Sequence, residues 1–172
     1  LVHVAMPSKA ANRCEWPTSI IPEELPDGDL LTMSSTASIG AFTQSGRRPD
    51  SIVIGPGLGR DERTIEAVKA ILGMATEQVI PIVVDADALG ALPRGKWPRG
   101  MTGVATPHQA EASRWLGEAD PHEALSECLE EDSTIVITGP EDRLTGPGGR
   151  SASARGGHPR MAVGGTGDLL AG

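Results

Sequence analysis

Five short aliphatic runs, each closely followed by Gly, Pro or Asp, constrain the fold of this chain most strongly. They are Val2–Ala5, Ile52–Ile54, Ile80–Val84, Gly103–Ala105 and Thr134–Ile137. Runs of this kind are typical of strands that are buried on both faces of a parallel sheet. Helix-like segments lie between or after several of them: Arg63–Met74, Gln109–Leu116 and Pro121–Glu130. The alternation predicts an α/β fold with a mainly parallel sheet flanked by helices on both faces.

The other segments are less regular. Ser8–Asp50 holds several Pro and Gly residues, and we expect one helix around Ser35–Phe42 between long connections. Arg143–Gly157 is rich in Gly and Ser, which predicts a loop or hairpin with a short antiparallel strand at Ser151–Ala154. The chain begins within a strand and ends about one helical turn after Asp168. We therefore expect residues 1–172 to be a partial domain, incomplete at both ends, from a longer protein.

The composition argues against two classes of function. The chain has a formal net charge of −8, a single Phe and no Tyr, so the basic surfaces and aromatic platforms that bind nucleic acids are scarce. No apolar run approaches the roughly 20 residues that a membrane span needs. Cys14 and Cys128 have no metal-ligand spacing, and we expect two free thiols in a cytoplasmic protein.

Unusual polar residues and glycines recur where the predicted strands end. Ile54 runs into Gly55-Pro-Gly-Leu-Gly59, and Val84 runs into Asp85-Ala-Asp87. Ala105 runs into Thr106-Pro-His108, and Ile137 runs into Thr138-Gly139. Because ligands of open α/β sheets bind beyond the carboxyl ends of the strands, these segments predict one shared site.

Two of these segments admit a structural and a functional interpretation. The glycines from Gly55 to Gly59 let a loop approach a ligand, or simply make a tight turn, since they lack the dinucleotide-binding spacing and a Walker lysine. Asp85 and Asp87 are candidates for binding a metal ion, a sugar hydroxyl or a helix N-terminus. For Asp87 we favour the structural interpretation, in which it caps a helical segment at Ala88–Leu92.

The segment that follows Ala105 has good helix-start chemistry. We expect Thr106 to be the N-cap, with Pro107 as the first helical residue. His108 would then lie in the first turn facing the cleft, and Glu111 would lie one turn further on the same face. The alternative is a capped helix with an exposed His and Glu.

The run Gly164-Gly165-Thr166-Gly167 is followed at once by Asp168 and by helix-forming residues. Backbone N–H groups of such a run, at a helix start, suit an anion such as a phosphate. A carboxylate there is unfavourable unless it has a role, and the natural role is a general base in phosphoryl transfer. Arg160 is a candidate phosphate partner, or else a solvated loop cation.

Taken in order, these motifs resemble the ADP/ATP-dependent NAD(P)H-hydrate dehydratase family of the ribokinase-like superfamily. The resemblance rests on four segments: Gly55–Gly59, Val84–Leu89, Thr106–Glu111 and Gly164–Gly172. It implies a ribokinase-like fold and dehydration of the S-epimer of hydrated NADH or NADPH, with ADP converted to AMP and phosphate, or ATP to ADP. It also implies Mg²⁺ at the phosphates, a homo-oligomer, and in many relatives a fused epimerase domain.

The resemblance also assigns roles to residues. Gly59, His108 and Asp168 would contact the hydrated dinucleotide, and Asp168 would act on the hydroxyl that is phosphorylated and eliminated. The adenine nucleotide would be held by Thr138, Gly139, Pro140, Glu141, Asp142, Gly165, Thr166 and Gly167. Where the family often has Lys-Gly, this chain has Thr138-Gly139. Either a phosphate contact is lost there, or Arg143 or Arg160 replaces it.

Two other functions remain open from the sequence. A ribokinase-like kinase of a vitamin precursor would share the glycine run and a base at Asp168. A nucleotide-binding module without turnover would share the binding residues alone. The segment Thr106–Glu111 and the pair Asp85 and Asp87 favour the dehydratase over the kinase.

Overall fold

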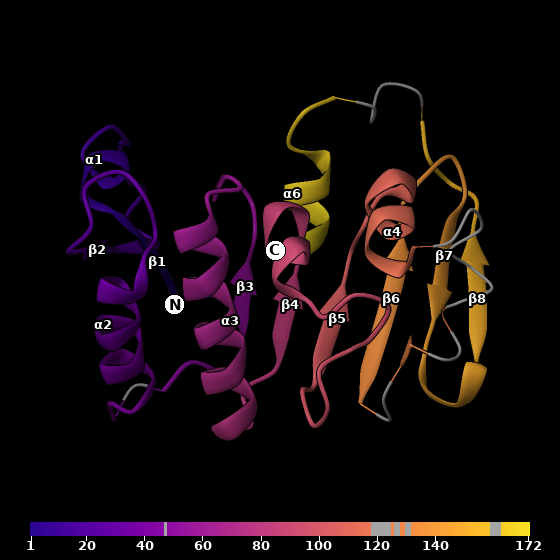
Figure 1. Cartoon of the computed structure of the whole chain (residues 1–172). Helices are drawn as coiled ribbons and strands as arrows, with labels where there is room; N and C mark the ends of the chain where they lie inside the picture. Colours follow the sequence, from indigo (N-terminus) through magenta and orange to yellow (C-terminus); the bar gives the residue numbers. More distant parts are fainter. Residues whose placement is uncertain (47, 118–124, 126–127, 130–131, 159–162) are drawn as a thin grey trace.

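A mostly parallel sheet forms the centre of the protein (Figure 1). The computed structural model describes residues 1–46, 48–117, 125, 128, 129, 132–158 and 163–172. Within them the main sheet has the strand order β3-β4-β5-β6-β7-β8. Its strands are β3 (Ile52–Ile54), β4 (Ile82–Val84), β5 (Gly103–Ala105), β6 (Ser133–Ile137), β7 (Asp142–Thr145) and β8 (Ser151–Ala154). Pairs from β3 to β6 are parallel, whereas β6–β7 and β7–β8 are antiparallel. The predicted sheet and the hairpin after it are both confirmed.

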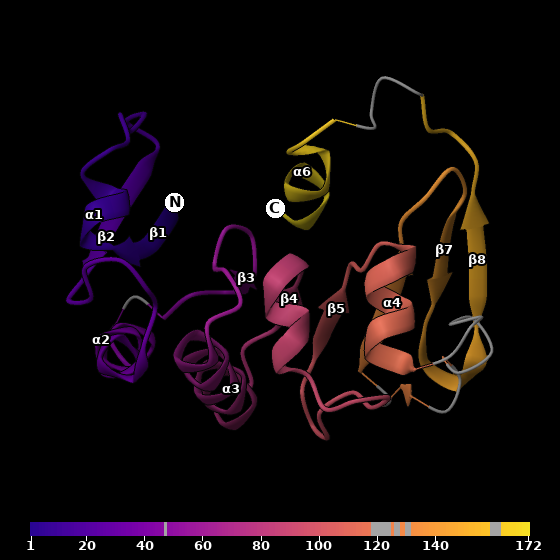
Figure 2. The same cartoon turned by 45° about the horizontal axis from the view of Figure 1, so that its top comes forward.

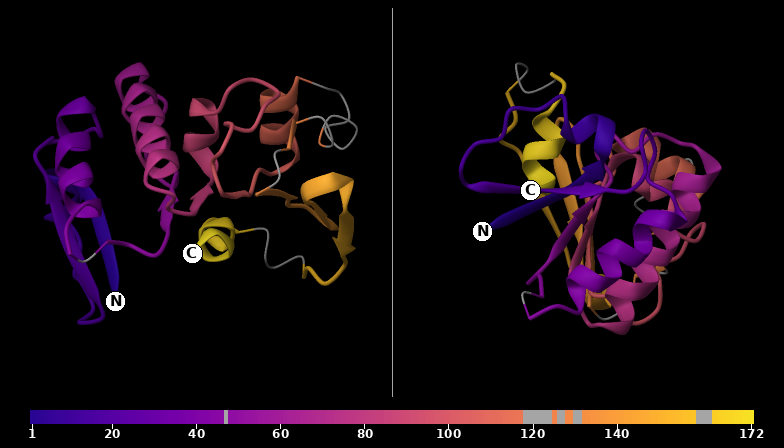
Figure 3. Two further views of the ribbon diagram at one scale, coloured as in Figure 1. Left: turned by 90° about the horizontal axis from the view of Figure 1, so that it is seen from below. Right: turned by 90° about the vertical axis from the view of Figure 1, so that its left-hand side faces the viewer.

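Helices flank both faces of this sheet. The helices α3 (Glu62–Glu77) and α4 (Gln109–Leu116), with the 3₁₀ helix η1 (Ala86–Ala91) between them, cover one face. Figure 3 shows the short helix α6 (Thr166–Ala171) on the opposite face. Only Ala171 of α6 is buried, whereas Leu169 and Leu170 are exposed. The prediction that helices flank both faces is therefore confirmed. In the described part of the chain, one face is covered by α3, η1 and α4, and the other only by the short helix α6.

The core lies between the sheet and α3, η1 and α4. Strand β6 shows why: Ser133, Ile135 and Ile137 are buried, while the residues between them are half-buried. Helix α3 meets this face with a helical-period stripe: Ala67, Val68, Ile71, Leu72 and Ala75 are all buried. The helix extends further than the predicted Arg63–Met74 at both ends, while α4 has the predicted bounds. The predicted helix Pro121–Glu130 falls largely outside the described residues.

The N-terminal segment forms a small unit beside the main sheet (Figures 1 and 2). Strand β1 (Val2–Pro7) pairs in parallel with β2 (Ile20–Leu25), with the short helix α1 (Ser8–Ala11) between them. The strand at Val2–Ala5 is thus confirmed, but it belongs to a separate two-stranded sheet. Strand β2 was missed because Pro22 and two glutamates interrupt its apolar pattern.

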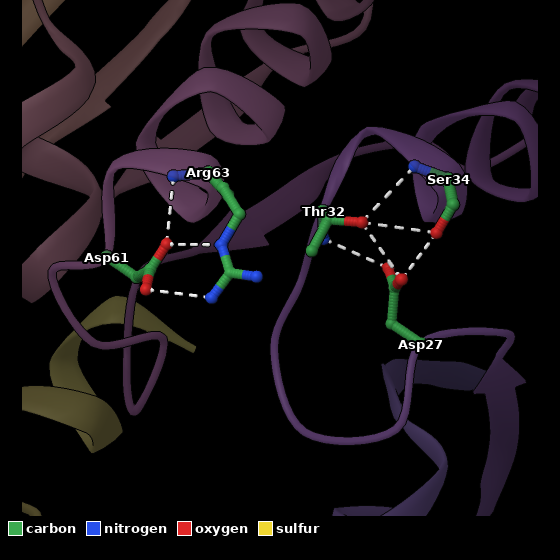
Figure 4. A network of polar contacts seen from close by, with 5 residues as sticks. All are labelled: Asp27, Thr32, Ser34, Asp61 and Arg63. Atoms are coloured by element: carbon green, nitrogen blue, oxygen red, sulfur yellow. Dashed lines mark hydrogen bonds and ion pairs between the residues drawn. The ribbon is translucent and has the colours of Figure 1, made fainter.

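Helix α2 (Met33–Thr43), expected around Ser35–Phe42, begins in a dense polar network (Figure 4). The N-cap Thr32 donates its backbone N–H and its hydroxyl to the Asp27 carboxylate at 3.0 and 2.9 Å. The hydroxyls of Ser34 and Ser35 donate to the same carboxylate. These bonds, above all those from the two serines, hold the pKa of Asp27 far below its usual range. One carboxylate therefore fixes the entry into α2.

Helix α3 begins with a similar device. The Asp61 carboxylate accepts the Arg63 backbone N–H at 3.0 Å and the Arg63 Nε–H at 2.9 Å (Figure 4). Bonding to Arg63 lowers the pKa of Asp61. An acidic N-cap suits the positive end of the helix dipole, so the helix start after β3 is fixed close to the loop that ends that strand.

Candidate active site

The loop after β3 lies in backbone contact with the end of β4. Gly55 has a φ of +143°, and a Cβ there would lie 1.8 Å from the carbonyl oxygen of Asp85. The Asp85 N–H donates to the Ile54 carbonyl oxygen at 3.0 Å. Only glycine fits such an approach. Gly55 thus locks the first two predicted segments of the site together.

Gly59, at the end of the same loop, is held by an acid from η1. Its N–H donates to Asp87 Oδ2 at 3.0 Å, and Arg60 Nε donates to Asp87 Oδ1 at 3.2 Å. The prediction that Asp87 caps a helix at Ala88–Leu92 is wrong. The 3₁₀ helix begins at Ala86, and Asp87 lies within its first turn with its carboxylate turned to the Gly59 loop.

Two polar side chains at neighbouring strand ends have no partner among the described residues. Asp85 follows β4, is 6% exposed, and its carboxylate accepts no hydrogen bond in that part of the chain. Thr106 follows β5, is 7% exposed, and its hydroxyl is equally unpaired. Buried polar groups are normally satisfied, so two unpaired groups on neighbouring strands single out this edge of the sheet as the candidate site.

His108 is the N-cap of α4, whereas the sequence predicted it to lie in the first turn of the helix. The prediction that Thr106 is the N-cap and Pro107 the first helical residue is wrong, because α4 begins two residues later with His108 as its N-cap. His108 Nδ1 accepts the N–H groups of Ala110 and Glu111 at 3.1 and 3.4 Å. Glu111 Oε2 in turn accepts the His108 N–H at 3.0 Å. This reciprocal capping box explains why the helix begins after His108 and not at the predicted Thr106-Pro107.

The remaining edge of the His108 ring faces outward. Its side chain is 58% exposed, and its Nε2 lies 3.4 Å from Glu111 Oε1. The Glu111 side chain is only 13% exposed. The structure therefore keeps His108 and Glu111 together, as predicted, with the imidazole at the surface of the site.

The predicted nucleotide segment lies beside His108. Thr138 forms a parallel β-bridge with His108, and its N–H donates to the Pro107 carbonyl oxygen at 3.0 Å. The chain then turns into β7, and the Gly139 N–H donates to Asp142 Oδ1 at 3.0 Å. This turn brings the predicted substrate residue and the start of the predicted nucleotide segment to one edge.

Two ionic groups accompany this turn, which also contains the exposed Pro140. Glu141 pairs with Arg155 at 3.1 Å, and this bond lowers the pKa of Glu141. Arg143 lies exposed in β7, opposite Ile137. Arg143 and Arg155 are thus described cations adjacent to the turn where the family's lysine is missing, and of the two Arg155 is paired with Glu141. Arg160 lies outside the described residues.

The glycine run leads into α6 as predicted. Gly165 is the N-cap with a φ of +93°, and the Thr166 hydroxyl donates to the Val163 carbonyl oxygen at 2.8 Å. A Cβ on Gly167 would meet nothing within 4 Å, so the space beside it is open. The Asp168 carboxylate is exposed in the first turn and has no hydrogen-bond partner among the described residues. Figures 1 and 3 place α6 toward the carboxyl ends of the parallel strands.

The described part of the chain offers no ready-made metal centre, since it holds no group of three His, Cys, Asp or Glu side chains that could bind a metal ion. No described helix is long and apolar enough to cross a membrane. Both cysteines are free, as predicted, and burial raises the pKa of the Cys128 thiol to about 11.

One feature of this region was missed from the sequence. A groove of about 350 Å³ lies between η1 and α4, and Asp87 and Glu111 are among the residues that line it. Its lining includes three arginines that lie far apart in the sequence: Arg60, Arg94 and Arg114. No local motif links them, so only the packing of η1 against α4 could reveal them.

Comparison with known proteins connects this geometry to a family. The family described as NAD(P)H-hydrate dehydratase matches residues 1–172. The bifunctional NAD(P)H-hydrate repair enzyme Nnr of Hyperthermus butylicus is 32% identical over 183 residues, which cover 100% of this chain and 33% of that protein. The ADP-dependent (S)-NAD(P)H-hydrate dehydratase of Xanthomonas campestris is 35% identical over 130 residues, covering 72% of this chain and 43% of the relative.

A solved structure supports the same family assignment. The ADP/ATP-dependent NAD(P)H-hydrate dehydratase from Bacillus subtilis, co-crystallized with ATP/Mg²⁺, is 27% identical with a TM-score of 0.59, covering 80% of this chain and 50% of that one. This chain thus spans between a third and a half of the length of these proteins. The shared architecture confirms the predicted ribokinase-like fold. With its full-length family match, the chain belongs to the NAD(P)H-hydrate dehydratase family.

Proposed function

We propose that the full-length protein dehydrates the S-epimer of hydrated NADH and NADPH while it consumes ADP or ATP. The observation that carries this proposal is the β-bridge between His108 and Thr138. It sets the residue assigned to the dinucleotide beside the segment assigned to the nucleotide. Asp85 and Thr106, buried without partners in the described part of the chain, add two polar groups to the same edge.

The reaction needs a group that takes a proton from a hydroxyl. In the proposed step, the ring hydroxyl attacks the terminal phosphoryl group of ADP, Asp168 accepts the hydroxyl proton, and AMP leaves. The ring then expels phosphate with its C–O electron pair, and loss of a proton from the neighbouring ring carbon restores the double bond. The exposed, unpaired carboxylate of Asp168 supports this role.

The other residues bind and orient. Gly59 leaves room for the dinucleotide, and His108 presents the outer edge of its ring to it. Thr138, Gly139, Pro140, Glu141 and Asp142, with Gly165, Thr166 and Gly167, surround the nucleotide in this proposal. Arg143 is the candidate substitute for the missing lysine. Mg²⁺ would arrive with the nucleotide, since phosphates and water usually supply most of its ligands and the described residues form no cage for it.

The proposal extends to the cellular setting. The chain carries free cysteines, which suits a reducing cytoplasm. Its bifunctional relatives support a fused epimerase domain in the parent protein. A homo-oligomer remains part of the proposal.

The test is turnover by the full-length protein with hydrated NADH and ADP, followed by phosphate release and by recovery of reduced-nicotinamide absorbance. Asp168→Asn should lower the turnover by about 10²–10⁴-fold, because the base is lost while the shape is kept. Asp50→Asn, an exposed acid outside the site, is the matched control and should leave turnover unchanged.

Each alternative predicts a different product. Phosphorylation of a vitamin precursor by ATP, without phosphate release, would identify a kinase. Tight ADP binding without any turnover would identify a binding module. An Asp168→Asn enzyme that kept more than half its activity would remove Asp168 from the mechanism.

A further inference from the structure

The loop Gly55–Gly59, between β3 and α3, has little of its own to hold it in one conformation. Gly55, Gly57 and Gly59 are glycines with positive φ, and a Cβ on Gly57 or Gly59 would meet nothing within 4 Å. Glycine loses more conformational entropy than any other residue when it is ordered. The position of Gly59, which contacts the dinucleotide in the proposed function, must therefore be fixed by contacts from outside the loop.

The two ends of this loop are anchored in different ways. Next to Gly55 the anchor is backbone, since the Ile54 carbonyl oxygen accepts the Asp85 N–H at 3.0 Å. At Gly59 the anchor is a side chain, since Asp87 Oδ2 accepts the Gly59 N–H at 3.0 Å. In the part of the chain that the structure describes, the Gly59 N–H has no other acceptor. A single carboxylate therefore fixes this end of the loop.

The same carboxylate also binds the residue after Gly59. Arg60 Nε donates to Asp87 Oδ1 at 3.2 Å, so one oxygen binds the arginine while the other binds the loop amide. A single bond would leave the Gly59 peptide free to rotate about it. Two bonds from one carboxylate to consecutive residues fix the orientation of this peptide as well as its position.

The backbone of Ala86 separates Asp87 from its neighbour Asp85. Ala86 has a φ of +47°, in the left-handed region that residues with a Cβ rarely adopt. Asp85 before it is 6% exposed at the end of β4, whereas the Asp87 side chain after it is 24% exposed and bonds to the loop. Such unfavourable conformations persist where the surrounding structure imposes them, and they cluster at functional sites. The left-handed turn thus lets Asp87 reach Gly59 while Asp85 stays at the sheet edge.

We propose that Asp87 is a positioning residue of the enzyme, whose carboxylate holds Gly59 in the place where the hydrated dinucleotide binds. The inference rests on the proposed function, in which Gly59 contacts that substrate. Asp87 acts through the loop and touches no reacting atom. A loop that is already ordered loses no further entropy when the substrate binds. Asp87 therefore contributes to affinity for the dinucleotide, and neither to the chemical step nor to the binding of the adenine nucleotide.

A neighbouring acid provides a matched control. The Asp61 carboxylate accepts the backbone N–H and the Nε–H of Arg63 at 3.0 and 2.9 Å, so it too binds one backbone amide and one arginine. Its bonds within the described ranges all go to Arg63, at the start of α3, and none goes to the loop Gly55–Gly59. Loss of either carboxylate removes bonds of the same kind, but only loss of Asp87 frees Gly59.

Steady-state kinetics of the full-length protein test the role. Asp87→Ala should raise the KM for hydrated NADH roughly 10-fold, which is the value of one charge-assisted hydrogen bond, with kcat and the KM for ADP within about twofold of the wild type. Asp87→Asn keeps an oxygen that can accept the Gly59 N–H and should restore most of the affinity. Asp61→Ala should leave all three constants unchanged. Equal KM values for hydrated NADH in Asp87→Ala and wild type, or equal rises in Asp87→Ala and Asp61→Ala, would overturn the assignment.

A second comparison decides the matter if Asp87→Ala does not fold. Asp87→Glu keeps the charge and the pairing with Arg60 but moves the carboxylate by one methylene, whereas Asp87→Asn keeps the geometry and loses the charge. Positioning of Gly59 predicts a higher KM for hydrated NADH in Asp87→Glu than in Asp87→Asn. The reverse order would show that Asp87 acts through its charge, and the proposal would fail.

Amide hydrogen exchange supplies a readout without substrate. The Gly59 amide should exchange more slowly than the Gly57 amide, which has no acceptor among the residues that the structure describes. Asp87→Ala should abolish this difference and Asp87→Asn should keep it, and equal exchange at the two glycines in the wild type would contradict the anchoring. If the wild-type protein turns over neither hydrated dinucleotide, the proposed function fails, while the exchange experiment still decides whether Asp87 orders Gly59.

Discussion

The contact between Gly55 and Asp85 predicts a large difference between two glycines of one loop. Gly57 has a φ of +72° and open space where a Cβ would project, whereas Gly55 has a φ of +143° and the Asp85 carbonyl oxygen 1.8 Å from that position. Ala at position 57 costs about 1–2 kcal/mol for the left-handed backbone. Alanine also lowers the conformational entropy of the unfolded chain, which offsets about 0.4–1 kcal/mol of this cost. We expect Gly57→Ala to destabilise the protein by about 1 kcal/mol.

Gly55→Ala adds two further costs. Its φ lies in a region that other residues scarcely adopt, and its Cβ would force the loop away from β4. That movement breaks the bond from the Asp85 N–H to the Ile54 carbonyl oxygen and leaves both groups buried and unpaired. Unsatisfied buried groups cost about 1–3 kcal/mol each. We therefore expect a total loss of about 4 kcal/mol or more, at the severe end of single substitutions.

The measurement is urea unfolding of the full-length protein, followed by circular dichroism. The midpoint should shift slightly for Gly57→Ala and drastically for Gly55→Ala, which at this cost approaches the whole stability of an ordinary domain. If Gly55→Ala does not fold, a folded Gly57→Ala shows that the loop itself tolerates alanine. Equal, small shifts in both proteins would refute the claim that the Asp85 contact constrains this loop.

Three further predictions concern single residues. His108→Asn should keep the helix cap but raise the KM for hydrated NADH more than the KM for ADP, whereas His108→Ala should in addition lose about 1 kcal/mol of stability through the missing cap; a rise in the ADP value alone would reverse the placement of the two ligands. Gly167→Val should weaken ADP binding in calorimetry with the fold retained, because a branched side chain would occupy the open space beside α6, and unchanged affinity would show that the glycine run is only a turn. Burial raises the pKa of the Cys128 thiol from 9.0 to about 11, so the protonated thiol should contribute fully to the free energy of unfolding below about pH 9, and this contribution should be lost between about pH 9 and 11. A Cys128→Ala protein should not show this loss of stability in unfolding titrations. At pH 8, iodoacetamide should modify the exposed Cys14 first.

The parts of the fold that could be predicted are those governed by local pattern. The runs Ile52–Ile54 and Gly103–Ala105 are strands with the predicted bounds, and α4 is the predicted helix, because buried parallel strands and a polar-apolar helix each leave a periodic signal. Strand β2 left no such signal. Strand β2 forms because it pairs with β1, although Pro22 disfavours a strand. Proline is tolerated there because both strands of a two-stranded sheet are edge strands.

The site shows the same division. That the strand-end segments lie together could be predicted, because the carboxyl ends of parallel strands meet at one edge of the sheet. It did not locate the partner of each side chain. Asp87 bonds to Gly59 from 28 positions away, and His108 rather than Thr106 caps α4 since its ring nitrogen reaches two free N–H groups. Contacts across such separations depend on packing, which periodicity does not describe.

The outermost strand of the main sheet has a consequence for self-association. Strand β8 consists of small, exposed Ser and Ala residues, with Arg150 before it and Arg155 after it. If the strands β8 of two molecules added edge to edge in antiparallel register, Arg150 of each would lie opposite Arg155 of the other. Like charges directly across a strand pair repel; the ion pair of Arg155 with Glu141 weakens this repulsion but leaves the guanidinium at the exposed edge. Small side chains in addition give little apolar area to stabilise the pairing. The composition of β8 therefore protects this open border against growth into larger aggregates, and replacing both arginines with valine should make the protein aggregate at concentrations at which the wild type stays dispersed.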